Sequence, residues 1–282
     1  MPATPKKKPS QHQRELAKAR AARRSPKNFY LVAYNAASAL GWAYVLYRLV
    51  AHLLTGTGDG GIKAAVGLET AGEKLLGRAR TGYSDFGDVV KLVQTAALLE
   101  AVHSGLGLVR SGILTTAAQI ASRILVVWYI CPFYPQVAAS PIYISMVFAW
   151  SFTEVVRYLH YVASLVNVKV PVLEWLRYST FYLMYPLGAG SECYLIFRSA
   201  AYAQQHFGIL GYVGTLATAA FWPPALFVMM SHMHKQRNRH LVNPGKKISS
   251  ATKAKIEAAQ GSASAPETPS RITRSRSKAN LS

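Results

Sequence analysis

Residues 176–200 read LRYSTFYLMYPLGAGSECYLIFRSA, a mainly apolar stretch that carries one acidic side chain, Glu192, in its second half. A bilayer core about 30 Å thick is crossed by about 20 apolar residues of helix, so this stretch is long enough to span a membrane. An ionised side chain at that depth is costly and usually faces the protein interior or a wet cavity. The stretch therefore predicts a membrane helix with a functional carboxylate.

Outward from this stretch, other apolar blocks of similar length fill the middle of the chain. The predicted spanning helices cover residues 29–54, 86–109, 113–134, 141–166, 176–200 and 209–230. Residues 55–84 are Gly-rich at first and then polar, and they are predicted to connect the first two helices. The pattern predicts an all-α fold, an integral membrane bundle of six transmembrane helices.

The charge of the chain lies mainly at its two ends. Of its 282 residues, 51% are hydrophobic and 16% charged, yet the net charge is +20. Residues 1–28 form a basic tail without the apolar core of a cleaved signal peptide. Residues 232–282 form a second basic tail, predicted to be disordered, and residues 29–231 form the six-helix transmembrane domain. Because Lys and Arg concentrate on the cytosolic side, both termini are predicted to be cytosolic, which requires an even number of spans.

The tails and cysteines offer weaker signals. Basic tails can bind nucleic acid, but anionic lipid of the bilayer lies beside them, so we predict lipid contact and no nucleic acid partner. His232, His234 and His240 could suggest a metal, but they follow the last predicted helix and are more simply solvated. Cys131 and Cys193 are too few for a disulfide framework or a four-ligand zinc site, and no metal is predicted.

Several ionisable side chains interrupt the predicted helices and are candidates for function. Some could pair with each other, and the one-turn spacing of Glu154 and Arg157 would allow it. Glu192 is different, because the nearest basic residue of its helix, Arg198, lies more than a turn away. Tyr185 precedes Glu192 by seven residues, which places both on nearly one helix face. The full set comprises Glu100, His103, Arg123, Glu154, Arg157, His160 and Glu192.

Pro186, Gly188, Ala189 and Gly190 lie between the tyrosine and the glutamate. The proline removes a backbone donor, and the small residues remove side-chain bulk at the depth where a substrate would need room. Helices interrupted in this way occur in membranes where the backbone lines a cavity or packs closely. Tyr185 and Glu192 are therefore predicted to border one cavity.

Three motifs resemble one family, the eukaryotic very-long-chain (3R)-3-hydroxyacyl-CoA dehydratases, once called protein-tyrosine-phosphatase-like membrane proteins. They read LEAVHSGLGLVRSG at 99–112, AWSFTEVVRYLHY at 149–161 and LRYSTFYLMYPLGAGSE at 176–192. The resemblance covers most of residues 29–234 and leaves out both tails. It implies that Tyr185 and Glu192 are the catalytic pair. It also implies six spans and the endoplasmic reticulum membrane.

The activity that the resemblance implies is the third step of fatty acid elongation, with the elongase and reductase enzymes of the cycle as partners. That step removes a proton from C2 of a 3-hydroxyacyl thioester and expels the C3 hydroxyl as water, without a cofactor. A poorly solvated Glu192 is a suitable base and Tyr185 a suitable acid. The residues equally allow the reverse assignment, or Tyr185 polarising the thioester carbonyl.

Substrate binding is predicted at Arg157, Tyr158, Arg177 and Gly188. The arginines lie toward the cytosolic ends of their helices, where they could attract the phosphates of CoA. Lys169 is better explained as an ordinary positive-inside anchor. A phosphatase loop Cys-x5-Arg built on Cys131 would need arginine where Val137 stands, so phosphatase activity is not expected.

Two other functions fit the same helices. A proton-coupled transporter would use Glu154, His160 and Glu192 as a relay, but the chain lacks the paired, repeated broken helices of many carriers. A non-catalytic scaffold of the elongation complex would tolerate loss of Tyr185 or Glu192, and both residues are present. The enzyme is therefore the preferred hypothesis.

Overall fold

The computed structural model describes residues 25–56, 70–109 and 113–242, and every regular element in these ranges is helical. Local sequence signals set several boundaries. Helix α2 (Pro26–Thr55) begins after Ser25, whose side chain accepts the backbone N–H of Asn28 at 3.2 Å. Helix α4 (Ala71–Ala96) begins with a reciprocal capping box between Thr70 and Glu73. Such caps satisfy N–H groups that have no partner within the helix.

The prediction of a polar connection through residue 84 is wrong for its second part, because α4 starts at Ala71. Apolar content alone missed this helix, since its first half is polar and rich in small residues. Gly82 packs so closely on Ile144 that a Cβ there would lie 2.4 Å from the Ile144 Cδ1 atom. Close packing through small residues stabilises this part of α4 without a long apolar run. Residues 57–69 of the connection lie outside the described ranges.

The following helices are more broken than the predicted spans. The block predicted at 86–109 divides between α4 and the short helix α5 (Leu98–Gly105). The block predicted at 113–134 comprises α6 (Ile113–Ile124), the π-helical segment η1 (Leu125–Ile130) and α7 (Cys131–Phe133). Helix α8 (Pro135–Ala138) adds one turn. Helix α9 (Pro141–Val166) has the predicted bounds and ends at Asn167, which adopts the left-handed φ of 59°.

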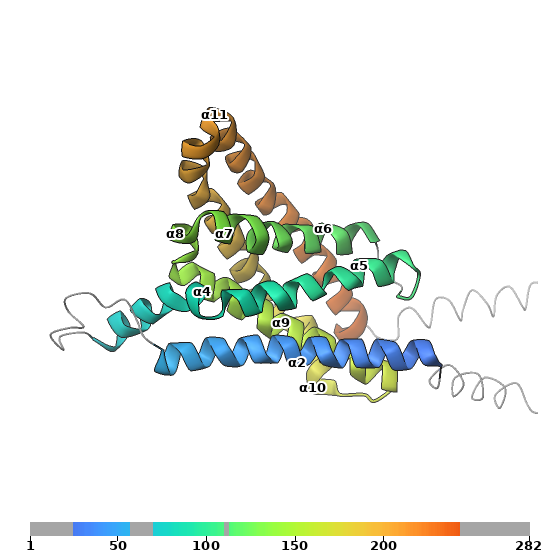
Figure 1. Ribbon diagram of the computed structural model, residues 1–282. Coiled ribbons are helices and arrows are strands. Elements are labelled where there is room, and N and C mark those ends of the chain that lie inside the picture. Colours follow the sequence, from blue (N-terminus) through green and yellow to red (C-terminus); the bar gives the residue numbers. More distant parts are fainter. Residues whose placement is uncertain (1–24, 57–69, 110–112, 243–282) are drawn as a thin grey trace, which may run out of the picture. The chain divides into compact units, whose positions relative to one another are not determined.

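The last two predicted spans form one long element. After α10 (Pro171–Ser179), helix α11 (Phe181–Arg237) runs through both, but Gly208 adopts φ 64° and ψ −155° and turns the chain back (Figure 1). We call residues 181–207 the first arm and residues 209–237 the second arm. The helix continues past His232 to Arg237. A separate unit starts at Asn238 with the π-helical segment η2 (Asn238–Val242).

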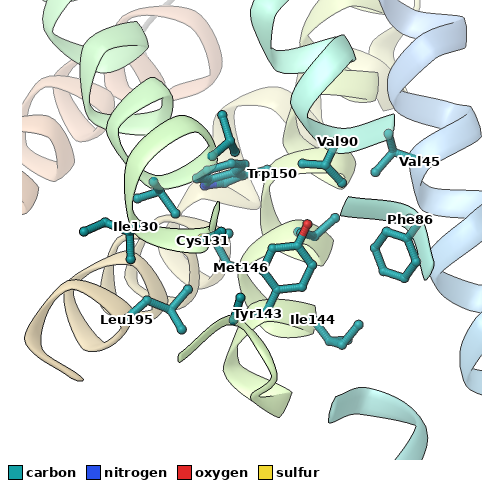
Figure 2. Close-up of a cluster of buried hydrophobic side chains, with 14 of the residues drawn as sticks. Val45, Phe86, Val90, Ile130, Cys131, Tyr143, Ile144, Met146, Trp150 and Leu195 are labelled. Atoms are coloured by element: carbon teal, nitrogen blue, oxygen red, sulfur yellow. The ribbon is translucent and has the colours of Figure 1, made fainter. Parts of the chain in front are cut away.

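Helix α9 is the centre of the unit that ends at Arg237, because it contacts α2, α4, α10 and α11. The core gathers apolar side chains from elements far apart in the sequence. Figure 2 shows part of it, with Val45 of α2, Phe86 of α4, Ile130 of η1, Trp150 of α9 and Leu195 of α11. Burial of this apolar surface joins the helices, and α9 presents one face to each neighbour.

The structure supports membrane association. Two helices of the described part, at Pro26–Thr55 and Phe181–Val242, are long and apolar enough to cross a bilayer. Large apolar side chains project from them, including Leu40, Leu210 and Phe227. The other helices of the described ranges do not meet the same criteria, and α4, for example, carries Arg80 and Asp85. The count of six spans thus stays a prediction.

Candidate active site

Glu192 lies in the first arm of α11 and is only 7% exposed. Its carboxylate accepts two hydrogen bonds from indole groups. Trp150 of α9 donates its Nε1–H to Oε1 at 2.8 Å, and Trp222 of the second arm donates its Nε1–H to Oε2 at 3.1 Å. Within the described ranges Glu192 takes part in no ion pair. The carboxylate is thus held by neutral donors from two other parts of the fold.

The two arms of α11 also contact each other beside the Glu192 carboxylate. Pro223 has no backbone N–H, so the carbonyl of Ala219, four residues earlier, lacks its usual helical donor. The thiol of Cys193 donates to that carbonyl at 3.5 Å. Neighbouring residues of the first arm, Glu192 and Cys193, therefore both bond to the segment around Pro223, which fixes the second arm against the first.

Tyr185 lies two turns before Glu192 on the same arm and is partly buried. Its ring packs edge-on against Phe181, with centroids 6.1 Å apart. Within the described ranges its hydroxyl has no hydrogen-bond partner, so it is free to bind another group. The positive charge of Arg123 acts on both Tyr185 and Glu192. These features agree with a shared polar region, while the common cavity stays a prediction.

A chain of ion pairs lies beside this region. Arg123 donates Nη1 to Oε1 of Glu154 at 2.5 Å, and its guanidinium lies 5.0 Å from the ring centroid of Trp150. Arg157 donates Nε to the other oxygen of Glu154 at 2.6 Å. The two other nitrogens of Arg157 bind the two oxygens of Glu100 at 2.8 and 2.6 Å. Two carboxylates and two guanidinium groups thus balance in charge between α5, α6 and α9.

The predicted substrate residues Arg157 and Tyr158 belong to this chain of ion pairs. All three nitrogen groups of Arg157 point to carboxylates, and the Tyr158 hydroxyl donates to Glu100. Tyr158 is also fully buried. The structure therefore gives both residues a supporting position beside the site, and contact with substrate stays a prediction. The pairing of Glu154 with Arg157, expected from their spacing, is confirmed.

Arg177 of α10 lies in a different environment. Its Nη2 donates to the Tyr161 hydroxyl at 3.1 Å, and its guanidinium lies over the rings of Tyr161 and Tyr178. Its Nε is buried without a hydrogen-bond partner among the described residues, and no carboxylate pairs with it there. A positive group with an unused donor is suited to bind an anion.

Gly188, the fourth predicted substrate residue, is buried against α9. A Cβ at this position would lie 3.5 Å from Ala149 Cβ and 3.8 Å from Trp150 Nε1, which are ordinary contacts. The glycine therefore brings the first arm close to the indole that binds Glu192. Its position suits a residue that shapes the site, and its contact with substrate is untested.

Other ionisable residues that the sequence analysis named form contacts that do not involve Tyr185 or Glu192. His103 of α5 is buried and pairs through Nε2 with the Tyr30 hydroxyl at 2.8 Å. His232 pairs with Gln236, and His234 pairs with the Tyr182 hydroxyl. In the part of the chain that the structure describes, no group of three or more His, Cys, Asp or Glu side chains could hold a metal.

Sequence reasoning missed the two indoles that bind Glu192. A signal for Trp150 existed, because it lies in the motif AWSFTEVVRYLHY one turn before Glu154 and so shares its helix face. Trp222 gave a weaker signal, as an indole directly before two prolines in a predicted span. Neither position could be linked to Glu192 without the fold, since the links join residues 42 and 30 positions apart.

Comparison with known proteins adds to this geometry. The model of the family described as "Protein tyrosine phosphatase-like protein, PTPLA" matches residues 94–243, which include the indoles, the ion pairs and Glu192. The chain belongs to this family. Despite that description, Cys131 is buried in the core and Val137 stands where a phosphatase loop would need arginine. The motifs noted in the sequence are thus those of a PTPLA protein.

Relatives of this PTPLA chain occur in fungi, plants and animals. A probable very-long-chain (3R)-3-hydroxyacyl-CoA dehydratase of Schizosaccharomyces pombe is 37% identical over 212 residues, 74% of this chain and 91% of the relative. The dehydratase PASTICCINO 2 of Arabidopsis thaliana is 32% identical over 232 residues, 76% of this chain and 94% of the relative. Dehydratase 2 of Homo sapiens is 28% identical over 176 residues, 62% and 61% of the two chains. No solved structure matches the chain.

Proposed function

We propose that the protein dehydrates very-long-chain (3R)-3-hydroxyacyl-CoA to trans-2-enoyl-CoA, the third step of the elongation cycle. The observation that carries the proposal is the environment of the Glu192 carboxylate. It is buried, two neutral indole groups donate hydrogen bonds to it, and within the described ranges it forms no ion pair with a cation. Such a carboxylate keeps its ability to accept a proton. Relatives of this chain in three kingdoms are named for this dehydration.

The reaction needs one base and one acid near adjacent carbons. Glu192 takes the proton from C2, which the thioester carbonyl makes acidic. The electrons of the C2–H bond form the C2–C3 double bond as the C3–O bond breaks. Tyr185 gives its phenolic proton to the departing hydroxyl, which leaves as water, and the proton on Glu192 returns to the phenolate before the next turnover. Proton transfer of this kind contributes about 10²–10⁴-fold to rate.

The CoA end of the substrate carries phosphates and stays in water. We place it near Arg177, because this guanidinium has an unused donor and no carboxylate partner among the described residues. Arg157 is less suited to that role, since Glu100 and Glu154 occupy its nitrogens. An anion-binding arginine at the end of α10 would hold the headgroup outside the apolar bundle.

The proposed topology has six spans with both termini in the cytosol of a cell whose endoplasmic reticulum membrane holds the protein. The catalytic domain is residues 29–231, and α11 supplies the last two spans because Gly208 divides it. In this arrangement α10 and the start of α11 face the cytosol, where CoA and the elongase and reductase enzymes of the cycle would meet the site. Six spans also agree with a positive charge excess at both ends.

The test is a product assay with purified protein in detergent and a very-long-chain 3-hydroxyacyl-CoA. Wild type should form the trans-2-enoyl product, and Glu192→Ala and Tyr185→Phe should lose nearly all activity while remaining folded. Full activity in either variant would exclude its residue from the chemistry. Solute flux in sealed vesicles with no enoyl product would instead favour a transporter.

A further inference from the structure

An apolar groove lies between the two arms of α11 and the π-helical segment η1. Its volume is about 380 Å³, and neither Tyr185 nor Glu192 lines it. Leu125, Tyr129 and Ile130 of η1 form one wall, and the arms form the others. Small side chains, among them Ala203, Gly211 and Gly214, leave the space open. Nothing in the catalytic mechanism above uses this space.

The groove continues the helix face that carries Glu192. Along the first arm, Ile196 follows Glu192 by four residues, Ala203 follows Ile196 by seven, and Phe207 follows Ala203 by four. Residues four and seven apart lie on nearly the same face of a helix. The first arm therefore leads from the proposed base directly along the groove to the turn at Gly208.

The second arm leads to the groove in the same way, starting from Trp222, which binds Glu192. Thr218 precedes Trp222 by four residues, and Gly211 precedes Thr218 by seven. The groove thus begins one turn beyond both Glu192 and Trp222, which hydrogen-bond to each other. At its far end stand Phe207 and Leu210, beside the turn between the arms.

We propose that this groove binds the acyl tail of the substrate and that its lining side chains, with Phe207 at the far end, set the preferred length of the tail. The proposal rests on the proposed function and names the part of the substrate that this second site takes. From Glu192 to Phe207 the first arm extends about 22 Å at 1.5 Å per residue. An extended tail that follows the first arm from Glu192 to its end would therefore cover more than one leaflet of a bilayer core, which is about 15 Å thick, half of about 30 Å.

The fold also explains how a tail enters. Phe207 is 55% exposed and Leu210 is 82% exposed, so the end of the groove opens toward the surface that we propose faces lipid. Tyr185 lies near the other end of the first arm, and Arg177 lies in α10, which precedes that arm. A thioester can therefore hold its headgroup near α10, its reacting carbons near Glu192 and its tail between the arms.

Gly214 offers a direct test, because a Cβ at this position meets no atom within 4 Å although the residue lines the groove. Gly214→Leu should fill the groove without a clash and lower kcat/KM for the longest 3-hydroxyacyl-CoA substrates by about tenfold or more, while shorter substrates keep their rates. Ala217→Leu is the matched control, since it adds a similar side chain to an exposed position of the same arm outside the groove. Phe207→Ala should shift the preference toward longer chains.

An equal loss at all chain lengths in Gly214→Leu, or an unchanged preference in both groove variants, would overturn the proposal. A second readout separates it from the catalytic proposal. A 3-hydroxyacyl-CoA with a diazirine at the end of its tail should label residues 203–218, and unlabelled substrate should compete. Labelling of these residues without enoyl product would contradict the proposed dehydratase activity and support tail binding in the groove. Product formation with labelling elsewhere, or with labelling that only phospholipid displaces, would sink the groove.

Discussion

Two buried carboxylates of this protein, Glu192 and Glu154, lie in opposite environments. Glu154 is 3% exposed and binds two guanidinium groups, those of Arg123 and Arg157. Glu192 is 7% exposed and binds two neutral indoles. Burial of a carboxylate is tolerated when charge or hydrogen bonds compensate it, and the two sites use these two different means.

The two environments suggest a structural role for Glu154 and a catalytic role for Glu192. A carboxylate that is paired with two cations binds a proton weakly, because the cations stabilise its charged form. Its removal leaves the two cations without their counter-charge. A carboxylate between two indoles is oriented but has no opposite charge to neutralise. Trp150 connects the two sites, since it donates to Glu192 and lies under the guanidinium of Arg123. We therefore expect substitutions at Glu192 to affect rate and substitutions at Glu154 to affect stability.

The largest effect is expected from Glu192→Gln. Glutamine keeps the size of the side chain and can still accept an indole N–H through its amide oxygen, but it cannot take a proton from C2. We expect kcat to fall by about 10³-fold, within the range for loss of general base catalysis. The melting temperature in detergent should stay near that of the wild type, and product formation is followed by mass spectrometry.

Glu154→Gln should show the opposite pattern. It leaves Arg123 and half of the Arg157 fork without a counter-charge, and breaking a buried pair in this way costs about 3–5 kcal/mol of stability. Thermal unfolding in detergent measures the loss. Asp88→Asn is the control, because Asp88 is an exposed acid of α4. Equal melting temperatures for the two variants would contradict a structural role for the ion pairs.

Trp222→Phe tests the indole donors and should have an intermediate effect. Phenylalanine keeps an aromatic ring in the second arm but removes the N–H that binds Oε2 of Glu192. A hydrogen bond to a charged group contributes about 1.5–3 kcal/mol, so kcat should fall by about tenfold or somewhat more, with little change in KM. Trp175→Phe removes an exposed indole of α10 and serves as control. A rise in KM with unchanged kcat would show that Trp222 binds substrate rather than orienting Glu192.

The smallest effect is expected from Arg177→Gln, which removes a partly buried guanidinium that has no carboxylate partner among the described residues. If it binds a CoA phosphate, KM should rise roughly three- to tenfold while kcat stays the same. Added salt should weaken substrate binding less in this variant than in the wild type. Lys169→Gln removes a neighbouring exposed charge, and a similar KM for both variants would remove Arg177 from the headgroup site.

Much of the fold and some of the site could be predicted from the sequence. The bounds of α9 follow from an apolar run between Pro141 and the polar Asn167, because a proline begins the helix and a left-handed residue ends it. The pairing of Glu154 with Arg157 followed from their spacing on one helix. The early start of α4 could not be read from hydropathy, since its stability depends on contacts such as that of Gly82 with Ile144.

The sequence by itself determined the helical class, the family, and the presence of Tyr185 and Glu192 two turns apart, because these depend on composition and on the period of one helix. Only the tertiary structure decided which acid pairs with cations and which with indoles, because Trp150 and Trp222 reach Glu192 from other helical segments. It also decided that the turn at Gly208 folds α11 on itself, which places the groove beside the site. Contacts between distant segments follow from packing, and local patterns do not encode them.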